Sequence, residues 1–285
     1  GVCGCKHSFF VRATAAFRKP PQTSTMFSVV NNFYIGAYQA AVNEASSLSH
    51  LDGTEATERD CFLYRSYIAL GSPELALAEI GDDASTALQA VKLWARYKSD
   101  PSSKEAVLNQ LQELMADPSC AANTTLQLMA ATVYACEDNQ TEALRCCHGG
   151  ASLELMALSV QCLLKMNRVD LAEKQLRAMS STDDDATLTQ LATAWVNIGL
   201  GGSKLQEAQY VFQELGEKYA WTPKLHNGAA VCHLQMGQYD EAERELLEAL
   251  NKDSKDPDTL ANLVIASVRV GKPSARFSAQ LKTVA

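Results

Sequence analysis

Apolar positions recur at intervals of three and four residues through most of the chain, and turn residues interrupt them at regular places. Leu225, Ala229, Cys232 and Met236 follow one another at i, i+4, i+7 and i+11, which is one face of a helix. A second such face begins soon after Gly237, with glutamates between its apolar positions. No segment alternates with a period of two for long enough to predict a strand. The pattern predicts an all-α chain built from pairs of helices.

A six-residue motif recurs at the turns between the predicted helices. Its copies read GAYQAA, GSPELA, PSSKEA, DNQTEA, NRVDLA, SKLQEA, GQYDEA and GKPSAR, starting at 36, 71, 101, 138, 167, 203, 237 and 271. Successive starts differ by 35, 30, 37, 29, 36, 34 and 34 residues. A helix–turn–helix unit with a period near 34 resembles the tetratricopeptide repeat.

The two most regular positions of the motif have physical causes. The first position is mostly Gly, Asn or Asp, the residues that best tolerate left-handed backbone where a helix ends. The sixth is Ala in seven of the eight copies, and a small side chain lets two helices cross closely. The glycines are therefore interpreted as turn residues and not as a phosphate-binding loop.

These observations predict a right-handed α-solenoid of seven to eight tetratricopeptide-like helix pairs over residues 26–285. The first helix of each pair is expected to line the concave side. In the final helix, Phe277 and Leu281 have no following repeat to cover them. Since a solenoid needs a polar cap at each end, we expect the solenoid to be incomplete at its C-terminus.

Residues 1–25 differ from the rest of the chain in charge. They contain Lys6, Arg12, Arg18 and Lys19 and no acid, so they carry +4, whereas the remainder has 21 basic and 33 acidic residues and carries -12. We predict a disordered basic extension. Two interpretations remain open: an organelle transit peptide, or translated upstream sequence before a start at Met26.

Composition excludes several classes of function. The net charge of -8 argues against a nucleic-acid groove, which needs clustered Lys and Arg. The chain has no run of eighteen apolar residues, so the sequence predicts no membrane-spanning helix. The nine cysteines are odd in number and scattered through helical patterns, which favours reduced thiols in the core over a disulfide framework.

Three groups of residues have ligand chemistry but lack the spacing of a metal site. Cys3-Gly-Cys5-Lys-His7 has no second ligand pair. Cys146-Cys147-His148 ends a helix, and adjacent side chains there diverge by about 100°. His226 and His233 are seven residues apart, whereas helical metal pairs are four apart. We predict no catalytic residue, metal, cofactor or small-molecule substrate, and hence no enzyme.

Four longer runs resemble the coatomer epsilon subunit family, most closely its plant and algal forms. They are NNFYIGAYQAAVNEA (31–45), ERDCFLYRSYIALGS (58–72), LTQLATAWVNIGLGGSKLQEAQYVFQEL (188–215) and EALNKDSKDPDTLANLVIASVRVGK (248–272). The resemblance begins near Met26 and includes the irregular spacings. Family members continue beyond the position of Ala285 and have nothing that matches residues 1–25.

The resemblance implies a non-catalytic structural subunit of the COPI vesicle coat. Such a subunit binds the C-terminal region of the coatomer alpha subunit and supports retrograde Golgi-to-ER and intra-Golgi transport. It would be cytoplasmic and reach the cytosolic face of Golgi membranes and COPI-coated vesicles indirectly, as a peripheral protein, through its partners.

The predicted partner-binding surface is the concave face of three first helices. Its candidate residues are Gln161, Leu164, Thr193, Val196, Asn197, Asn227, Val231 and Leu234. The apolar members would form a stripe that holds a partner segment. The alternative is that they pack against the neighbouring repeat.

A different class of function stays open beside the coat subunit. A tetratricopeptide adaptor or scaffold would bind peptide segments, and it would act in an organelle if residues 1–25 are a transit peptide. A clamp for acidic peptides needs Lys, Asn and Arg on successive first helices. Lys224 and Asn227 begin one, but Ala186 and Thr189 occupy the matching places in the preceding helix.

Overall fold

The computed structural model describes residues 26–49, 51–148, 150 and 152–284. Within those ranges it contains sixteen α-helices, one short 3-10 helix and no strand. The basic extension and the Cys3–His7 cluster lie outside the described residues. The prediction of an all-α chain is confirmed.

The described helices form eight consecutive pairs. They are α1 (Phe27–Ile35) with α2 (Tyr38–Ser47), α3 (Gly53–Ala69) with α4 (Pro73–Glu79), α5 (Thr86–Ser99) with α6 (Lys104–Ala116), α7 (Thr124–Cys136) with α8 (Gln140–Cys147), α9 (Leu153–Lys165) with α10 (Val169–Thr182), α11 (Thr187–Leu200) with α12 (Lys204–Lys218), α13 (Pro223–Gln235) with α14 (Tyr239–Lys252), and α15 (Pro257–Val270) with α16 (Ala275–Val284). Each copy of the six-residue motif lies at the turn inside one pair.

The left-handed turn residue predicted at the first motif position is present in six pairs. The four glycines at 36, 71, 237 and 271 have φ values of 86°, 79°, 77° and 82°. Asp138 and Asn167 adopt the same conformation at 63° and 56°. These are the non-glycine residues that best tolerate it, because their short polar side chains bond to nearby backbone.

The other two pairs close their turns differently. Before α6, Pro101–Ser103 forms a 3-10 helix, and the Asp100 side chain accepts hydrogen bonds from the Ser102 N–H and hydroxyl. Before α12, Gly201 and Gly202 take the positive φ values, because the inserted LGGS moves the turn ahead of Ser203.

The motif alanine is buried in six of the seven second helices that carry it. Its side chain is fully buried in six second helices, at Ala41, Ala76, Ala143, Ala172, Ala208 and Ala242. Ala106 is exposed, and Val107 is buried in its place. The 3-10 turn before α6 therefore shifts the inward-facing position by one residue, which the motif alignment did not anticipate.

Polar caps fix the starts of five first helices. Asp52, Asn123, Ser152, Thr222 and Asp256 each accept a hydrogen bond from a backbone N–H in the first turn of the helix that follows. Such caps satisfy N–H groups that have no partner within the helix. They set the first helices of the array at defined positions.

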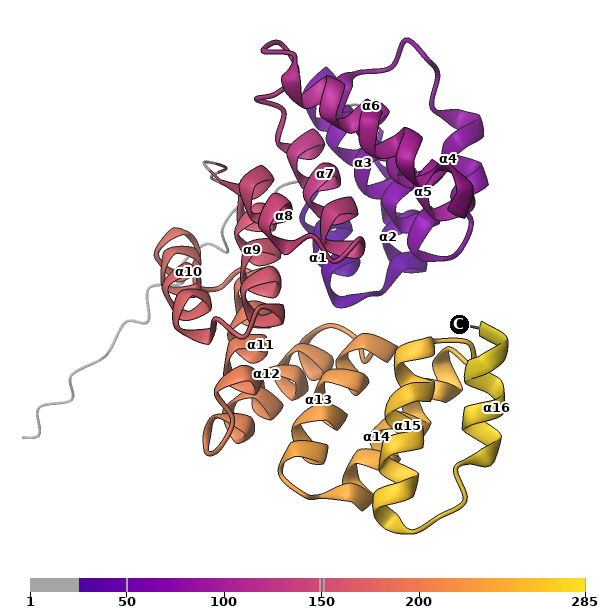
Figure 1. The fold of residues 1–285 in the computed structure, drawn as a ribbon, viewed down its shortest axis with the longest axis vertical. Helices are drawn as coiled ribbons and strands as arrows, with labels where there is room; N and C mark the ends of the chain where they lie inside the picture. The colour runs from indigo at the N-terminus through magenta and orange to yellow at the C-terminus, as the bar shows by residue number, and fades with distance from the viewer. Residues whose placement is uncertain (1–25, 50, 149, 151, 285) are drawn as a thin grey trace, which may run out of the picture.

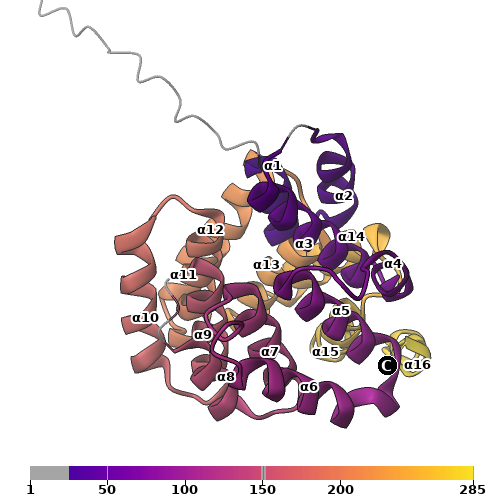
Figure 2. The ribbon, with the colours of Figure 1, turned by 90° about the horizontal axis from the view of Figure 1, so that it is seen from above.

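The pairs stack side by side and curve into a ring. Figure 2 shows α3, α5, α7 and α9 on the inner side of the ring and α4, α6, α8 and α10 outside them. The last pairs, α13 to α16, continue below the first pairs (Figure 1). The fold is an α-solenoid with the first helices lining its inner side, as predicted.

The last pair is less exposed than its sequence predicts. Phe277 is half-buried because it packs on a core cluster of Ala230, Leu246, Leu263 and Ala266 from the two preceding first helices and α14. Leu281 is also half-buried.

Candidate functional site

The first helical pair contacts helices far away in the sequence. Ile35, at the end of α1, lies in a core cluster with residues of α11, α12 and α13, among them Leu191, Phe212 and Leu225. The Thr222 hydroxyl donates a hydrogen bond to the Ile35 carbonyl oxygen at 2.5 Å. The Thr187 hydroxyl donates to Asn31 Oδ1 at 2.5 Å. We call the contact of α1–α3 with α9, α11 and α13 the seam.

An ion pair reinforces the seam between α3 and α9. Arg65 donates to both carboxylate oxygens of Glu154, at 2.6 and 3.3 Å. Its guanidinium also lies 4.5 Å from the centre of the Phe33 ring and 4.9 Å from that of Phe62. Burial opposes the charge of Arg65, but Glu154 outweighs burial and raises the pKa of the guanidinium. Burial, followed by Glu154, raises the pKa of Tyr34 beside it.

Three of the eight predicted partner-binding residues are buried. Val196 belongs to the core cluster shared by α9, α10 and α11, and Asn197 is buried beside it. Asn227 is also buried, and its amide nitrogen donates to Asp256 Oδ2 and Thr259 Oγ1 at 3.1 and 2.6 Å. These side chains hold neighbouring pairs together in the described structure and present little surface to a partner.

The other five predicted residues keep some surface. Gln161 is exposed, while Leu164, Thr193, Val231 and Leu234 are half-buried. Leu164 packs in the α9–α11 cluster and Leu234 in the α13–α15 cluster. Whether these residues bind a partner stays a prediction. They lie on α9, α11 and α13, where the burial of Val196 interrupts the predicted apolar stripe.

Two exposed apolar residues on α15 were missed by the sequence reasoning. Ile265 is 50% exposed and Val268 is 61% exposed. They lie 34 residues after Val231 and Leu234, so they occupy the same positions of the next repeat. That offset was available from the sequence. They extend the candidate surface to the last first helix.

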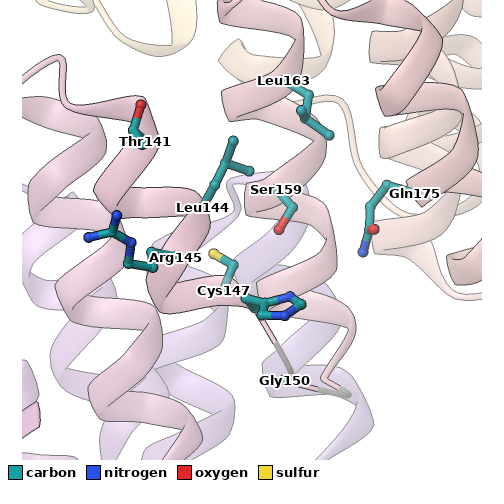
Figure 3. Close-up of a pocket in the computed structure, with 9 residues that line it drawn as sticks. Thr141, Leu144, Arg145, Cys147, Gly150, Ser159, Leu163 and Gln175 are labelled. Atoms are coloured by element: carbon teal, nitrogen blue, oxygen red, sulfur yellow. The ribbon is translucent and has the colours of Figure 1, made fainter.

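A pocket with a volume of about 430 Å³ lies between α8, α9 and α10. Figure 3 shows Cys147 and Ser159 on facing helices at its wall. The Ser159 hydroxyl donates to the Leu155 carbonyl oxygen, and burial raises the pKa of the Cys147 thiol. A raised thiol pKa disfavours the reactive thiolate of Cys147, and the Ser159 hydroxyl is already donated within its own helix.

His226 and Cys147, from the two described groups, are used for packing. His226 stacks on Trp221 with ring centres 4.7 Å apart, and its Nδ1 lies 2.7 Å from Glu245 Oε2. Cys147 is buried and Cys146 half-buried. Nowhere in the described ranges do three or more His, Cys, Asp or Glu side chains gather as a metal site would require.

No helix that the structure describes is long and apolar enough to span a bilayer.

Comparison with protein families agrees with the resemblance in the sequence. A model described as the coatomer epsilon subunit matches residues 22–285. Coatomer subunit epsilon-2 and epsilon-1 of Arabidopsis thaliana are 52% and 51% identical over 257 residues, which is 90% of this chain and 87% and 88% of theirs. Coatomer subunit epsilon of Dictyostelium discoideum is 37% identical over 270 residues, covering 91% of this chain and 90% of its own.

Solved structures share the fold at low identity. A tetratricopeptide repeat protein from Parabacteroides merdae has a TM-score of 0.59 at 10% identity and covers 91% of both chains. A chain of the APC/C hetero-tetramer Cut9-Hcn1 has a TM-score of 0.64 at 11% identity, covering 92% of this chain and 52% of that one. These likenesses establish the solenoid architecture alone.

Proposed function

Because the chain belongs to the coatomer epsilon subunit family, we propose that it binds the C-terminal region of the coatomer alpha subunit and supports that part of the COPI coat. It would act in retrograde Golgi-to-ER and intra-Golgi transport. The observation that carries this proposal is the family match, which spans the described solenoid at about half identity to the plant proteins. The coat role of the family is structural, and on this proposal the inner face would supply the surface for binding.

The proposed contact surface lies on the inner side of α13 and α15. Val231, Leu234, Ile265 and Val268 occupy equivalent positions of two successive repeats. The last two keep at least half of their side-chain surface exposed. Exposed apolar side chains in register on adjacent helices are suited to holding an apolar segment of a partner. The membrane would then be reached through the alpha subunit.

The test measures capture of the recombinant C-terminal region of coatomer alpha by the purified chain. We expect a stable complex, and Ile265→Asp/Val268→Asp should weaken it by about tenfold or more, because interface cores tolerate buried charge poorly. Leu70→Asp/Leu75→Asp is the matched control, since both leucines are similarly exposed on the second pair. Val231→Asp/Leu234→Asp should act in the same direction, with its fold checked by thermal melting.

Failure of the wild-type chain to capture the alpha region would contradict the proposed partner. Equal capture by the α15 variant and the control would move the contact away from α13 and α15. The location of a fluorescent fusion distinguishes the coat subunit from the adaptor alternative. A coat subunit should give perinuclear Golgi puncta, whereas an imported adaptor should give fluorescence inside an organelle.

A further inference from the structure

A second pocket, of about 350 Å³, opens at the seam. Its walls come from α1, α3, α9, α11 and the loop that enters α11. All four helices are first helices of their pairs, and most of the lining residues lie near their N-terminal ends. Apolar side chains form most of its surface, including Met26, Val30, Leu153 and Leu188.

Three carboxylates stand among the residues that line this pocket. They are Glu55 and Glu58 from the start of α3 and Asp183 from the loop after α10. No basic residue is among the described residues of its lining. The nearby Arg65 is already engaged by Glu154 at 2.6 Å. Burial, followed by the charges of Glu154 and Glu55, raises the pKa of Glu58.

We propose that this pocket binds a protein partner's segment by accepting a lysine or arginine side chain. A long basic side chain has an apolar stem and a cationic head. Its stem would lie against Val30, Leu153 and Leu188, and its head would meet the carboxylates of Glu55, Glu58 and Asp183. Ion pairing with hydrogen bonds to carboxylates is the strong form of such contact. The pocket would therefore recognise a partner segment in which a basic residue stands next to an apolar one.

This inference rests on the proposed function, and it gives the same partner a second contact, at the seam, apart from the apolar residues on α15. A partner that crosses the ring would contact apolar residues on α15 and carboxylates at the seam. The two contacts differ in their dependence on salt, because screening weakens the ionic one far more.

The experiment compares two double variants with the same change in charge. Glu55→Gln/Glu58→Gln neutralises the pocket, and Glu105→Gln/Glu113→Gln neutralises two exposed glutamates on the outer helix α6. Affinity for the C-terminal region of coatomer alpha is measured by calorimetry at about 50 and 500 mM salt. We expect the pocket variant to bind about tenfold more weakly at low salt, with a smaller difference at high salt. The α6 variant should match wild type.

Equal binding by the pocket and α6 variants, with wild-type binding intact, overturns this inference and leaves the proposed function standing. If wild type fails to bind the alpha region, the proposed function fails, and a second probe decides the pocket. That probe is a short fluorescein-labelled peptide of alternating lysine and leucine. The pocket variant should lose affinity for it selectively, and equal affinity of both variants overturns the inference.

The chain's own basic segment is the competing occupant. Lys19 lies seven positions before Met26, which itself lines the pocket. Carbodiimide joins an amine to a carboxylate in direct contact, so the chain is cross-linked alone and its linked peptides are identified. A link from Lys19 to Glu55 or Glu58 assigns the pocket to the segment 1–25 and overturns the partner proposal. Links from these glutamates to the partner's lysines in the complex support it.

Discussion

The first helical pair contacts helices more than 150 residues away, whereas the last pair, α15 and α16, packs on helices close to it in the chain. Hydrogen bonds join Asn31 to Thr187 and Ile35 to Thr222 across 156 and 187 positions. At the other end, α15 packs on α13, α14 and α16. The first and last helix pairs are thus held by different sets of contacts.

The difference separates two sources of stability. In an open solenoid, stability is a sum of terms within repeats and between nearest neighbours, so ends open independently. The seam adds contacts between the first pair and later pairs. Disrupting it should therefore affect α1–α3 and α9–α13 together, while a defect in the last pair should stay local.

Breaking the seam ion pair should have the largest effect. Glu154→Ala leaves Arg65 charged in a site where its side chain is only 11% exposed. We expect a loss of about 3 kcal/mol in the free energy of unfolding, because an uncompensated buried charge is costly. Urea denaturation followed by circular dichroism measures it.

The matched control is the surface pair of Lys92 with Asp82, whose carboxylate is 99% exposed. Asp82→Ala should leave the urea midpoint unchanged. The double variant Arg65→Leu/Glu154→Leu should recover much of the loss, because it removes both charges. A Glu154→Ala midpoint equal to that of Asp82→Ala would show that the seam ion pair does not stabilise the array.

A cavity in the seam should destabilise more distant helices than a cavity near the C-terminus. Ile35 and Leu263 are both fully buried, and truncating either to alanine should cost about 2–3 kcal/mol. Ile35→Ala should speed amide hydrogen exchange in α1, α11 and α13. Leu263→Ala should speed it from α13 onward only.

Hydrogen exchange with mass spectrometry resolves the two patterns by helix. If Ile35→Ala leaves α11 and α13 as protected as in wild type, the seam is not a cooperative unit. If Leu263→Ala exposes α1, the array unfolds as a whole and the distinction between the two ends disappears.

The turns and the buried alanines were predictable because they depend on neighbouring residues alone. Gly36, Gly237 and Gly271 occupy turns where backbone geometry selects the residue, and the motif alanines pack within one pair. At Ala106 the predicted inward-facing position was wrong by one residue. The 3-10 turn before α6 shifts the helix register although the motif sequence is retained.

The seam was not predictable because no periodicity relates Asn31 to Thr187 or Arg65 to Glu154. Such contacts depend on the total rotation that accumulates from pair to pair around the ring. The repeat motif does not determine this total rotation. For the same reason, the repeat pattern did not predict which candidate site residues are buried. Asn227 occupies a concave position by repeat register, but its burial follows from Asp256 and Thr259 of the next pair.

Substitution of two turn glycines, Gly36 at the seam and Gly237 away from it, should have smaller effects on stability. Gly36 and Gly237 have φ values of 86° and 77°, so alanine at either position should cost about 1 kcal/mol. A Cβ at Gly36 would also lie 2.9 Å from Lys224 Cδ, whereas a Cβ at Gly237 meets nothing within 4 Å. Gly36→Ala should therefore lose more stability in urea and also increase exchange in α13. Equal losses with no change in α13 would mean that Lys224 moves aside freely.

The smallest effect is expected at Glu58, and it depends on pH. Burial, then Glu154 and Glu55, raises the folded-state pKa of this carboxyl. A raised pKa favours the protonated form in the fold, so its stabilising contribution is complete below the unfolded pKa of about 4.3. That contribution is lost as pH rises through the folded pKa. Glu58→Gln cannot ionise, and it should therefore be slightly more stable than wild type at pH 7 and indistinguishable near pH 4. Urea midpoints of both proteins across this range measure the difference. A variant less stable than wild type at pH 7 would place a cation of the chain itself against Glu58, and the seam pocket would then already be occupied.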